Sequence, residues 1–376
     1  MDKRKRKVIY AISILVGTIV GAGYLSLPYV ASKVGFGIML LYFLILGAVA
    51  LVIHLVFTDV ALETKDYLRF PGYAKIYFGR KGEMFALFLT VFSIIGTLLA
   101  YAIVGGELLA GLFSSFGEKS AFFYTLFYFA IASVLIYFGI KIVSRVQFLA
   151  MILFLFVIVV MIFASWDIIS FEKAFLPLQL PYLFLPYGAL LFAFCGLNLI
   201  PEAEEILKKD KKLLKKLVIP FSIFISLLLY VVFTFLVLGI CGKETTDVAV
   251  PCLNSFLSKN VVALVIFFVI TTTFTSFLTL GLTLKKTLLY DFKIKKKISW
   301  ALTCFVPLIL FLLGVRSFID IIIFIGAVML GLQSIMIVLM YQKLKKPSQL
   351  KKKLVLFFIF LFVLGIIYQV VFFLKF

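Results

Sequence analysis

The sequence is poor in charged side chains and in the residues from which enzyme and metal sites are built. Only 14% of the 376 residues are charged, and His54 is the single histidine. The four cysteines are dispersed without a CxxC pair or a mixed Cys/His spacing, so we predict no structural metal and no organic cofactor. The chain shows no HExxH motif, no Ser/His/Asp arrangement and no nucleotide-binding P-loop. We therefore expect a protein that is not an enzyme and does not hydrolyse nucleotides.

Apolar side chains dominate the chain, and they occur in long runs. The sequence is 64% hydrophobic with a mean hydropathy of +1.21, whereas soluble proteins are about half apolar. A membrane-spanning helix needs about 20 apolar residues, and the runs lack the strict alternation of a membrane β-barrel. Eleven runs are present, at about 8–32, 36–58, 83–112, 121–140, 146–166, 182–203, 215–241, 256–284, 298–315, 318–341 and 353–374. We predict an all-α integral membrane protein with about 11 transmembrane helices in a single domain, 1–376.

The basic residues are distributed unevenly between the two ends of these spans. The net charge is +20, with 37 Lys and Arg against 17 Asp and Glu. If the N-terminus is cytoplasmic, 30 of the 37 basic residues lie in the cytoplasmic connections, as the positive-inside rule requires. The charge therefore orients the chain in a lipid bilayer and does not indicate a nucleic-acid partner. We expect a multi-pass protein of the cell (plasma) membrane with its N-terminus cytoplasmic and its C-terminus outside.

The first apolar run contains a segment that an unbroken helix would not tolerate well. Its sequence, VGTIVGAGYLSLP at 16–28, includes Gly17, Gly21, Gly23 and Pro28. Glycine is costly inside a helix and proline removes a helical hydrogen bond. In a bilayer, the backbone groups freed by a break must face protein or a watery cavity. A helix broken at this depth is typical of a transporter binding site. The alternative is a kinked helix with close glycine contacts to its neighbours.

A second break is predicted five spans later. The sixth run, LPYGALLFAFCGLNLIPEAEEI at 185–206, is interrupted between Cys195 and Pro201, with Gly196 inside the interruption. Spans one to five begin on the cytoplasmic side and spans six to ten begin outside. Two five-helix halves of opposite orientation, each led by a broken helix, form an inverted repeat. We assign the halves to 8–166 and 182–341, with an additional eleventh helix at 353–374.

Several motifs, in order along most of the chain, carry a resemblance to a known family. They are GTIVGAGYLSLPYVASKVGFG at 17–37, GYAKIYFGRKG at 72–82, LAYAIVGGELL at 99–109, LFAFCGLNLIPEAEE at 191–205 and TTTFTSFLTLGLTL at 271–284. The set resembles the amino acid/auxin permease group and the bacterial aromatic amino acid permeases of the amino acid–polyamine–organocation superfamily. The resemblance implies the LeuT-type 5+5 fold with broken helices 1 and 6. Asn198 departs from the family pattern, because relatives vary at that position and commonly have a small residue or histidine there.

The broken helices predict where an amino acid zwitterion binds. The N-terminal end of a half-helix presents free N–H groups and the positive end of its dipole. We expect the amides of Ala22, Gly23 and Tyr24 to face the substrate carboxylate, with Gly21 also leaving room for its approach.

The opposite helix ends predict the site of the substrate ammonium. We expect the carbonyl groups of Ile19, Ala193 and Phe194 to accept its hydrogen bonds. The family pattern implies that Tyr101 and Phe194 form the wall around the substrate side chain. The predicted substrate-binding set is completed by Thr18, Cys195 and Asn198.

The eighth span carries a cluster of hydroxyl groups. Thr272 and Ser276 share one face of the expected helix. The resemblance implies a sodium site in which these hydroxyls or that of Thr273 join the carbonyls of Gly17 and Val20. The alternative is that the hydroxyls bond carbonyls of their own helix. Some proton-coupled proteins that the sequence resembles place a lysine of span five where the ion would lie. Span five, 146–166, carries no lysine here, so the resemblance favours Na+ over a proton as the coupling ion.

Two acidic residues are candidates for gating or proton transfer, because ionisable groups inside spans are commonly functional. Glu107 lies towards the outer end of span three and can also snorkel, and Glu202 follows the second break near the cytoplasm. We interpret His54 as a packed neutral side chain. Cys241 and Cys252 bracket a short outer loop, and a disulfide and two free thiols are both compatible with the sequence.

Together these features predict a secondary active transporter of amino acids that works by alternating access. The substrate would bind between helices 1 and 6, and an ion gradient would drive uptake. A non-transporting amino acid sensor on the same fold is the alternative.

Overall fold

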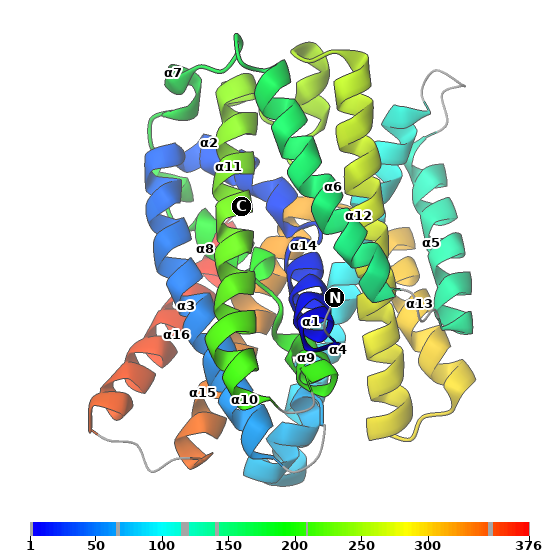
Figure 1. Ribbon diagram of the computed structural model, residues 1–376, viewed down its shortest axis with the longest axis vertical. Helices are drawn as coiled ribbons and strands as arrows, with labels where there is room; N and C mark the ends of the chain where they lie inside the picture. The colour runs from blue at the N-terminus through cyan, green and yellow to red at the C-terminus, as the bar shows by residue number, and fades with distance from the viewer. Residues whose placement is uncertain are drawn as a thin grey trace.

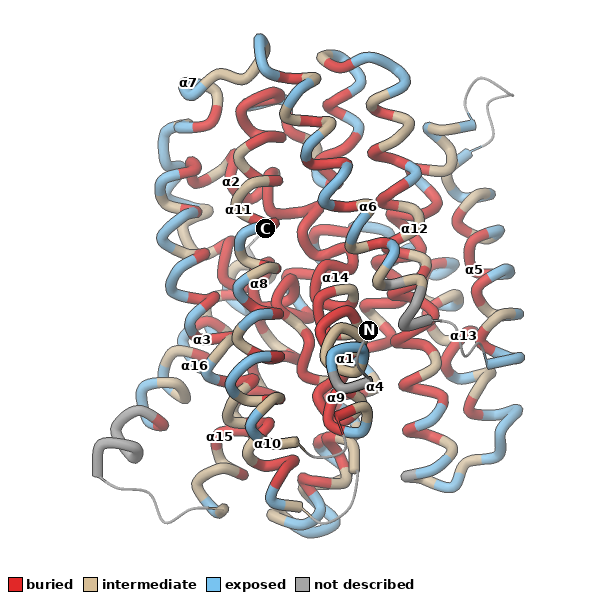
Figure 2. Tube along the Cα trace, viewed as in Figure 1, coloured by how far each residue is buried: buried red, intermediate tan, exposed pale blue. Residues whose placement is uncertain are grey.

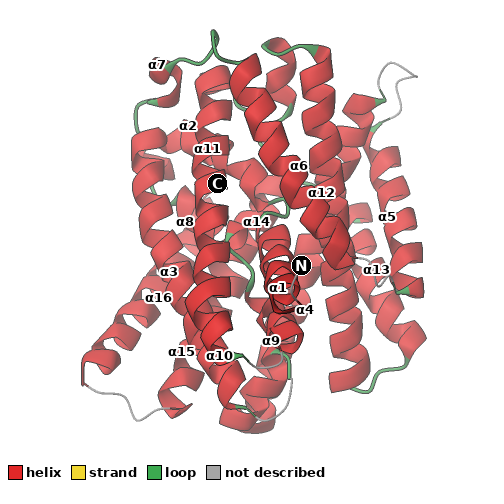
Figure 3. Ribbon diagram, in the orientation of Figure 1, coloured by secondary structure: helices red, strands yellow, loops and turns green. Residues whose placement is uncertain are grey.

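The computed structural model describes residues 3–64, 68–113, 120–139, 143–207, 210–344 and 349–375, and within these ranges the regular structure is helical (Figures 1 and 3). In chain order the elements are α1 (Lys3–Ile19), η1 (Gly23–Ser26), α2 (Leu27–Val34), α3 (Phe36–Glu63), α4 (Phe70–Leu112), α5 (Ala121–Phe138), α6 (Val143–Ala164), α7 (Phe171–Ala174), η3 (Leu180–Tyr182), α8 (Leu185–Ala193), η4 (Leu197–Leu199), α9 (Ile200–Leu207), α10 (Lys211–Leu213), η5 (Leu214–Val218), α11 (Ile219–Cys241), η6 (Gly242–Glu244), η7 (Pro251–Ser255), α12 (Lys259–Lys286), η8 (Thr287–Asp291), α13 (Lys296–Leu312), α14 (Phe318–Phe324), η9 (Ile325–Leu330), α15 (Gly331–Leu344) and α16 (Gln349–Lys375).

Each of the eleven predicted spans corresponds to one helix or to a run of consecutive helices. Nine of them, within the described ranges, are long and apolar enough to cross a membrane. The other two are shorter: the apolar part of α6 is Phe148–Ala164, and α13 has 17 residues. The all-α membrane architecture expected from the hydropathy is therefore confirmed.

The spans that contain the breaks lie at the centre of the bundle. In the most apolar stretch of the spans Lys5–Val34, Leu180–Leu207 and Phe318–Leu344, 72%, 78% and 83% of the residues are buried. The corresponding values for Ala121–Phe138 and Val355–Leu374 are 28% and 22%. Figure 2 shows the same contrast, with buried backbone in the middle and exposed residues on the outer helices. The first, sixth and tenth spans are thus inside the protein. The backbone groups freed by the breaks in the first and sixth spans are therefore kept away from lipid.

The first span breaks where its glycines predict. α1 ends at Ile19, and the chain resumes helical structure at Gly23 after a short non-helical segment. Pro28 occupies the first turn of α2, where the missing N–H costs little because that donor would have no helical acceptor. The chain then leaves α2 through Gly35, whose φ of 80° is easily adopted only by glycine.

The sixth span also breaks, but earlier than its sequence suggested. α8 ends at Ala193, and the irregular segment begins at Phe194. Helical structure resumes at Leu197, and Pro201 already lies in the first turn of α9. The prediction that the interruption extends to Pro201 is therefore wrong, because proline is well accommodated at the start of a helix.

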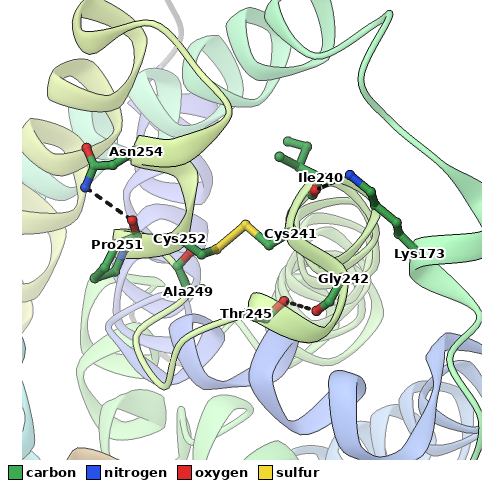
Figure 4. Close-up of a disulfide and its surroundings, with 9 residues drawn as sticks. All are labelled: Lys173, Ile240, Cys241, Gly242, Thr245, Ala249, Pro251, Cys252 and Asn254. Atoms are coloured by element: carbon green, nitrogen blue, oxygen red, sulfur yellow. Dashed lines mark hydrogen bonds between the residues drawn. A yellow bond between two sulfur atoms is a disulfide. The ribbon is translucent and has the colours of Figure 1, made fainter.

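The loop between α11 and η7, which the charge distribution predicts to be external, is closed by a disulfide bond (Figure 4). Cys241 is the last residue of α11 and Cys252 lies in η7, with their Cα atoms 6.1 Å apart. Lys173 donates a hydrogen bond over 3.2 Å to the carbonyl of Ile240 and so connects α7 to the same end of α11. Of the two alternatives left open by the sequence, the structure contains the disulfide.

Candidate functional site

The C-terminal ends of the two half-helices meet at one tyrosine. The hydroxyl oxygen of Tyr230, on α11, lies 2.6 Å from the carbonyl oxygen of Ile19 and 2.8 Å from that of Ala193. Ile19 ends α1 and Ala193 ends α8. These are two of the three carbonyls that the sequence predicts for the substrate ammonium, and the structure brings them together.

The N–H side of the first break faces a second tyrosine. The hydroxyl of Tyr101, on α4, lies beside the backbone of Gly21 and Ala22, and a Cβ at Gly21 would overlap its oxygen. A Cβ at Gly23 would lie 2.7 Å from the Cα of Ala193. Gly21 and Gly23 therefore allow two different close approaches: one by the Tyr101 hydroxyl and one by the backbone of α8.

A small cavity lies between the breaks and α4. It is lined by six of the predicted substrate-binding residues, namely Thr18, Ile19, Gly23, Tyr101, Cys195 and Asn198. It is completed by Ser93, Ile94, Thr97, Phe192, Gly196, Leu199 and Leu280. Its volume is about 20 Å³, room for about one water molecule. An amino acid would therefore require the surrounding helices to separate.

Five predicted residues do not line this cavity: Gly21 and Ala193, described above, and Ala22, Tyr24 and Phe194. Ala22 contacts Tyr101 as described, and the Tyr24 ring packs against Phe233 at 4.8 Å between ring centroids. Phe194 lines a different small cavity against α3 and packs on Tyr230 at 5.3 Å. The Phe194 side chain thus packs against α3 and α11 and not into the cavity that Tyr101 lines.

Several polar side chains of the site are not among the residues predicted from the sequence. Ser93 and Thr97 precede Tyr101 at intervals of four residues, so the three share one face of α4. That periodicity was a usable signal. Gln333, on α15, is buried and donates a hydrogen bond over 3.2 Å to the Oδ1 atom of Asn198. No comparable periodicity marks Gln333, whose neighbour is Ser334, or Tyr230, because both lie in largely apolar runs.

Most of the predicted sodium ligands lie together between α1, α6 and α12. Gly17, Val20 and Thr272 line a cavity of about 10 Å³, to which Thr275 also contributes. Ser276 donates a hydrogen bond over 3.3 Å to the Gly17 carbonyl. Carbonyl and hydroxyl oxygens are hard donors of the kind that Na+ prefers, so the residues present fit this ion.

Some hydroxyls of the cluster bond carbonyls of their own helix, as the alternative interpretation requires. The hydroxyl of Thr272 donates to the Val269 carbonyl over 3.0 Å, and that of Thr273 donates to Ile270 over 3.1 Å. Thr273 does not line the cavity. Among the described residues, no group of three or more His, Cys, Asp or Glu could hold a metal ion.

The single histidine lies behind the second break. Its Nδ1 atom is 2.7 Å from the carbonyl oxygen of Ala50, one turn earlier on α3. A Cβ at Gly196 would lie 3.1 Å from the Nε2 atom, so the imidazole faces the irregular segment of span six. His54 is buried.

The two acidic candidates have different surroundings. Glu202, on α9, lies 3.8 Å from the Nε atom of Arg69 at the start of α4, so it connects two elements on the predicted cytoplasmic side. Lys208 and Lys209, its nearest basic neighbours in the sequence, lie outside the described residues. Glu107 is exposed near Asp247, which lies in the loop closed by the disulfide. Partial desolvation and the nearby Asp320 carboxylate raise the pKa of Asp247 against the opposing effect of Lys33.

The sequence matches a known protein family over nearly its whole length. The sequence model of the tryptophan/tyrosine permease family matches residues 4–373, nearly the whole chain. The chain belongs to the tryptophan/tyrosine permease family. The resemblance to amino acid permeases is thereby confirmed at the level of the family, and the wider superfamily assignment stays a prediction.

Two curated relatives in this family come from Haemophilus influenzae. The protein is 36% identical over 121 residues to tyrosine-specific transport system 2, and 30% identical over 114 residues to tyrosine-specific transport system 1. These matches span only 29% and 28% of the relatives' lengths and 31% and 30% of this chain.

Solved structures with the same fold cover much more of the chain. MhsT in complex with L-phenylalanine superposes with a TM-score of 0.72 at 15% identity, over 97% of this chain and 98% of that one. Mhp1, a nucleobase-cation-symport-1 family transporter in a closed conformation with bromovinylhydantoin bound, gives 0.68 at 14% identity, over 88% and 77%. At these identities the likeness concerns the fold alone, and that fold is the LeuT-type arrangement with two broken helices.

Proposed function

We propose that this permease is a secondary active transporter of amino acids with an aromatic side chain, tyrosine or tryptophan. It binds its substrate between the two broken helices and works by alternating access. The observation that carries the proposal is the convergence of the ends of α1 and α8 beside a cavity lined by Thr18, Tyr101 and Asn198. The family and the names of the Haemophilus relatives support the choice of substrate.

The two breaks supply complementary groups for a zwitterion. Carbonyl groups at Ile19 and Ala193 suit the ammonium, and the amides that follow Gly21 suit the carboxylate. The aromatic ring would extend towards Phe192 and Leu280, with Asn198 available for a polar ring atom. Because binding pockets for small molecules have volumes of about 300–1,000 Å³, the cavity must enlarge for the substrate to enter.

The coupling ion in this proposal is Na+. The carbonyls of Gly17 and Val20 and the hydroxyl of Thr272 border one small cavity, and Ser276 lies close enough to contact the Gly17 carbonyl. This arrangement connects α1 to α12, so an ion held there would couple to the position of the first broken helix. A proton carried by Glu107 or Glu202 is the alternative. The proposal includes a plasma-membrane location, a cytoplasmic N-terminus and an external C-terminus.

The test is uptake of radiolabelled L-tyrosine and L-tryptophan into proteoliposomes. An imposed Na+ gradient and an imposed pH gradient are applied separately. We expect uptake driven by the Na+ gradient, and uptake driven only by the pH gradient would refute sodium coupling. Binding without uptake or counterflow would instead identify a sensor. Folded protein that neither binds nor transports either amino acid would refute the proposed function.

The ion site has its own control. Thr272→Ala should raise the Na+ concentration needed for half-maximal uptake, because it removes one oxygen from the cavity. Thr271→Ala is the matched control, since the exposed Thr271 hydroxyl bonds only within its own helix, to the Phe267 carbonyl at 2.8 Å. An unchanged Na+ dependence in Thr272→Ala would refute the assignment.

A further inference from the structure

Tyr230 connects the two broken helices through a single hydroxyl group. Its oxygen is within hydrogen-bonding distance of the last carbonyl of α1 and the last carbonyl of α8, at Ile19 and Ala193. Those residues are 211 and 37 positions away in the sequence. Tyr230 itself belongs to α11 and is completely buried.

Two helix ends that converge in this way need a donor between them. The last carbonyls of a helix have no intrahelical partner, and each C-terminal end carries about half a negative charge. Two such ends repel each other, and in a buried site water does not screen them. The phenol of Tyr230 places one proton between the Ile19 and Ala193 oxygens, so a neutral group offsets the repulsion.

The ring of Tyr230 is held in place by the same two breaks. It packs against Phe194, the first residue after α8, at 5.3 Å and 57°. It also stacks on Tyr24 of η1 at 6.5 Å and 9°. Aromatic residues from both breaks thus pack on the ring and restrict its orientation.

We propose that Tyr230 is a positioning residue that sets the spacing of the ammonium subsite. This inference rests on the proposed function. Each carbonyl oxygen has two lone pairs, so Ile19 and Ala193 can accept from Tyr230 and from the substrate ammonium together. The hydroxyl thus holds the two acceptors at one separation before the ammonium arrives, and it requires no cation at the junction to do so.

The test compares a substrate with an analogue that lacks the ammonium group. Binding of L-tryptophan and of indole-3-propionate is measured on the purified full-length chain. We expect Tyr230→Phe to weaken L-tryptophan binding by about 10-fold or more, because the carbonyls lose the donor that fixes them. Binding of indole-3-propionate should stay within about twofold of the wild type, since that probe makes no use of the ammonium subsite.

Tyr187→Phe is the matched control. It also removes a buried tyrosine hydroxyl from a backbone carbonyl, that of Phe362 at 3.3 Å, but between α8 and α16. We expect the control to leave the affinities for both probes unchanged. Melting temperatures of both variants separate a loss of stability from a loss of ammonium recognition.

Each other outcome overturns the inference. Equal weakening of both probes, an unchanged affinity for L-tryptophan, or the same effect in Tyr187→Phe would show that Tyr230 does not set this subsite. A Tyr230→Phe chain that fails to reach the membrane would show a purely structural role. Wild-type protein that binds neither L-tryptophan nor L-tyrosine would instead refute the proposed function, which separates the two failures.

Discussion

The two broken helices approach each other closely at Gly23, and Gly23→Ala tests how much the site depends on this contact. A Cβ at this position would lie 2.7 Å from the Cα atom of Ala193, 3.1 Å from Phe192 Cδ1 and 3.2 Å from Ala193 Cβ. The first of these is a backbone atom, which cannot rotate away. The 2.7 Å separation is 0.7 Å shorter than the 3.4 Å at which such contacts become ordinary. η1 and α8 must therefore move apart by about that distance.

That displacement should affect ligand binding more than folding. Overpacking a buried contact costs about 1–3 kcal/mol of stability, which a multi-helix bundle can tolerate. Misplacing recognition groups by about 1 Å costs on the order of 100-fold in reactions that depend on alignment. The carbonyl of Ala193 and the amide of Gly23 belong to the displaced segments. We therefore expect L-tryptophan binding to Gly23→Ala to be weaker by about 30- to 100-fold.

The assay is a binding titration on purified protein, with melting temperature measured in parallel. Gly111→Ala is the control, because a Cβ at Gly111 would meet nothing within 4 Å and the residue lies at the far end of α4. Alanine is a better helix former than glycine by about 1 kcal/mol, so the control should melt at the same or a higher temperature with unchanged affinity. A Gly23→Ala protein that binds L-tryptophan within about threefold of the wild type would refute the reasoning.

Two further predictions concern the loop that the disulfide between Cys241 and Cys252 closes. Reduction of the Cys241–Cys252 disulfide should lower the melting temperature. The two cysteines are separated by 11 positions, and removing such a cross-link lowers the free energy of unfolding by about 3 kcal/mol in the chain-entropy treatment. Equal melting temperatures with and without reductant would contradict this prediction. The raised pKa of Asp247 means that the folded state disfavours the charged carboxylate. The contribution of Asp247 to the free energy of unfolding is therefore most favourable below its unfolded pKa, and it is lost as the pH rises through its folded pKa. Asp247→Asn should accordingly melt above the wild type at pH 7 and coincide with it near pH 4, and melting curves that differ by the same amount at both pH values would exclude this cause.

The conformation of each break follows largely from local chemistry. Gly17, Gly21 and Gly23 weaken the helix within the first span, and Pro28 marks where the next half-helix begins. These effects involve only neighbouring residues, so a linear pattern suffices to predict them. The number of spans follows from run length in the same way, because the thickness of the bilayer is fixed.

The direction in which side chains point was less predictable. The spans are apolar on nearly every face, and in lipid both outward and inward faces are apolar, so periodicity does not distinguish them. Phe194, a predicted wall of the substrate site, packs on Tyr230 and lines the cavity against α3. Thr273, a predicted ion ligand, does not line the cavity that Gly17, Val20 and Thr272 share.

The sequence by itself determined that this protein is helical, where its spans lie, and that the first and sixth are broken. Those properties depend on backbone chemistry and on hydropathy along the chain. Only the tertiary structure decided that Tyr230 joins the ends of α1 and α8, that Tyr101 lies over Gly21, and that Cys241 pairs with Cys252. The contacts at the breaks depend on the rotation and separation of helices far apart in the chain. A uniformly apolar span does not encode its own rotation, because any of its faces can be buried at nearly the same cost.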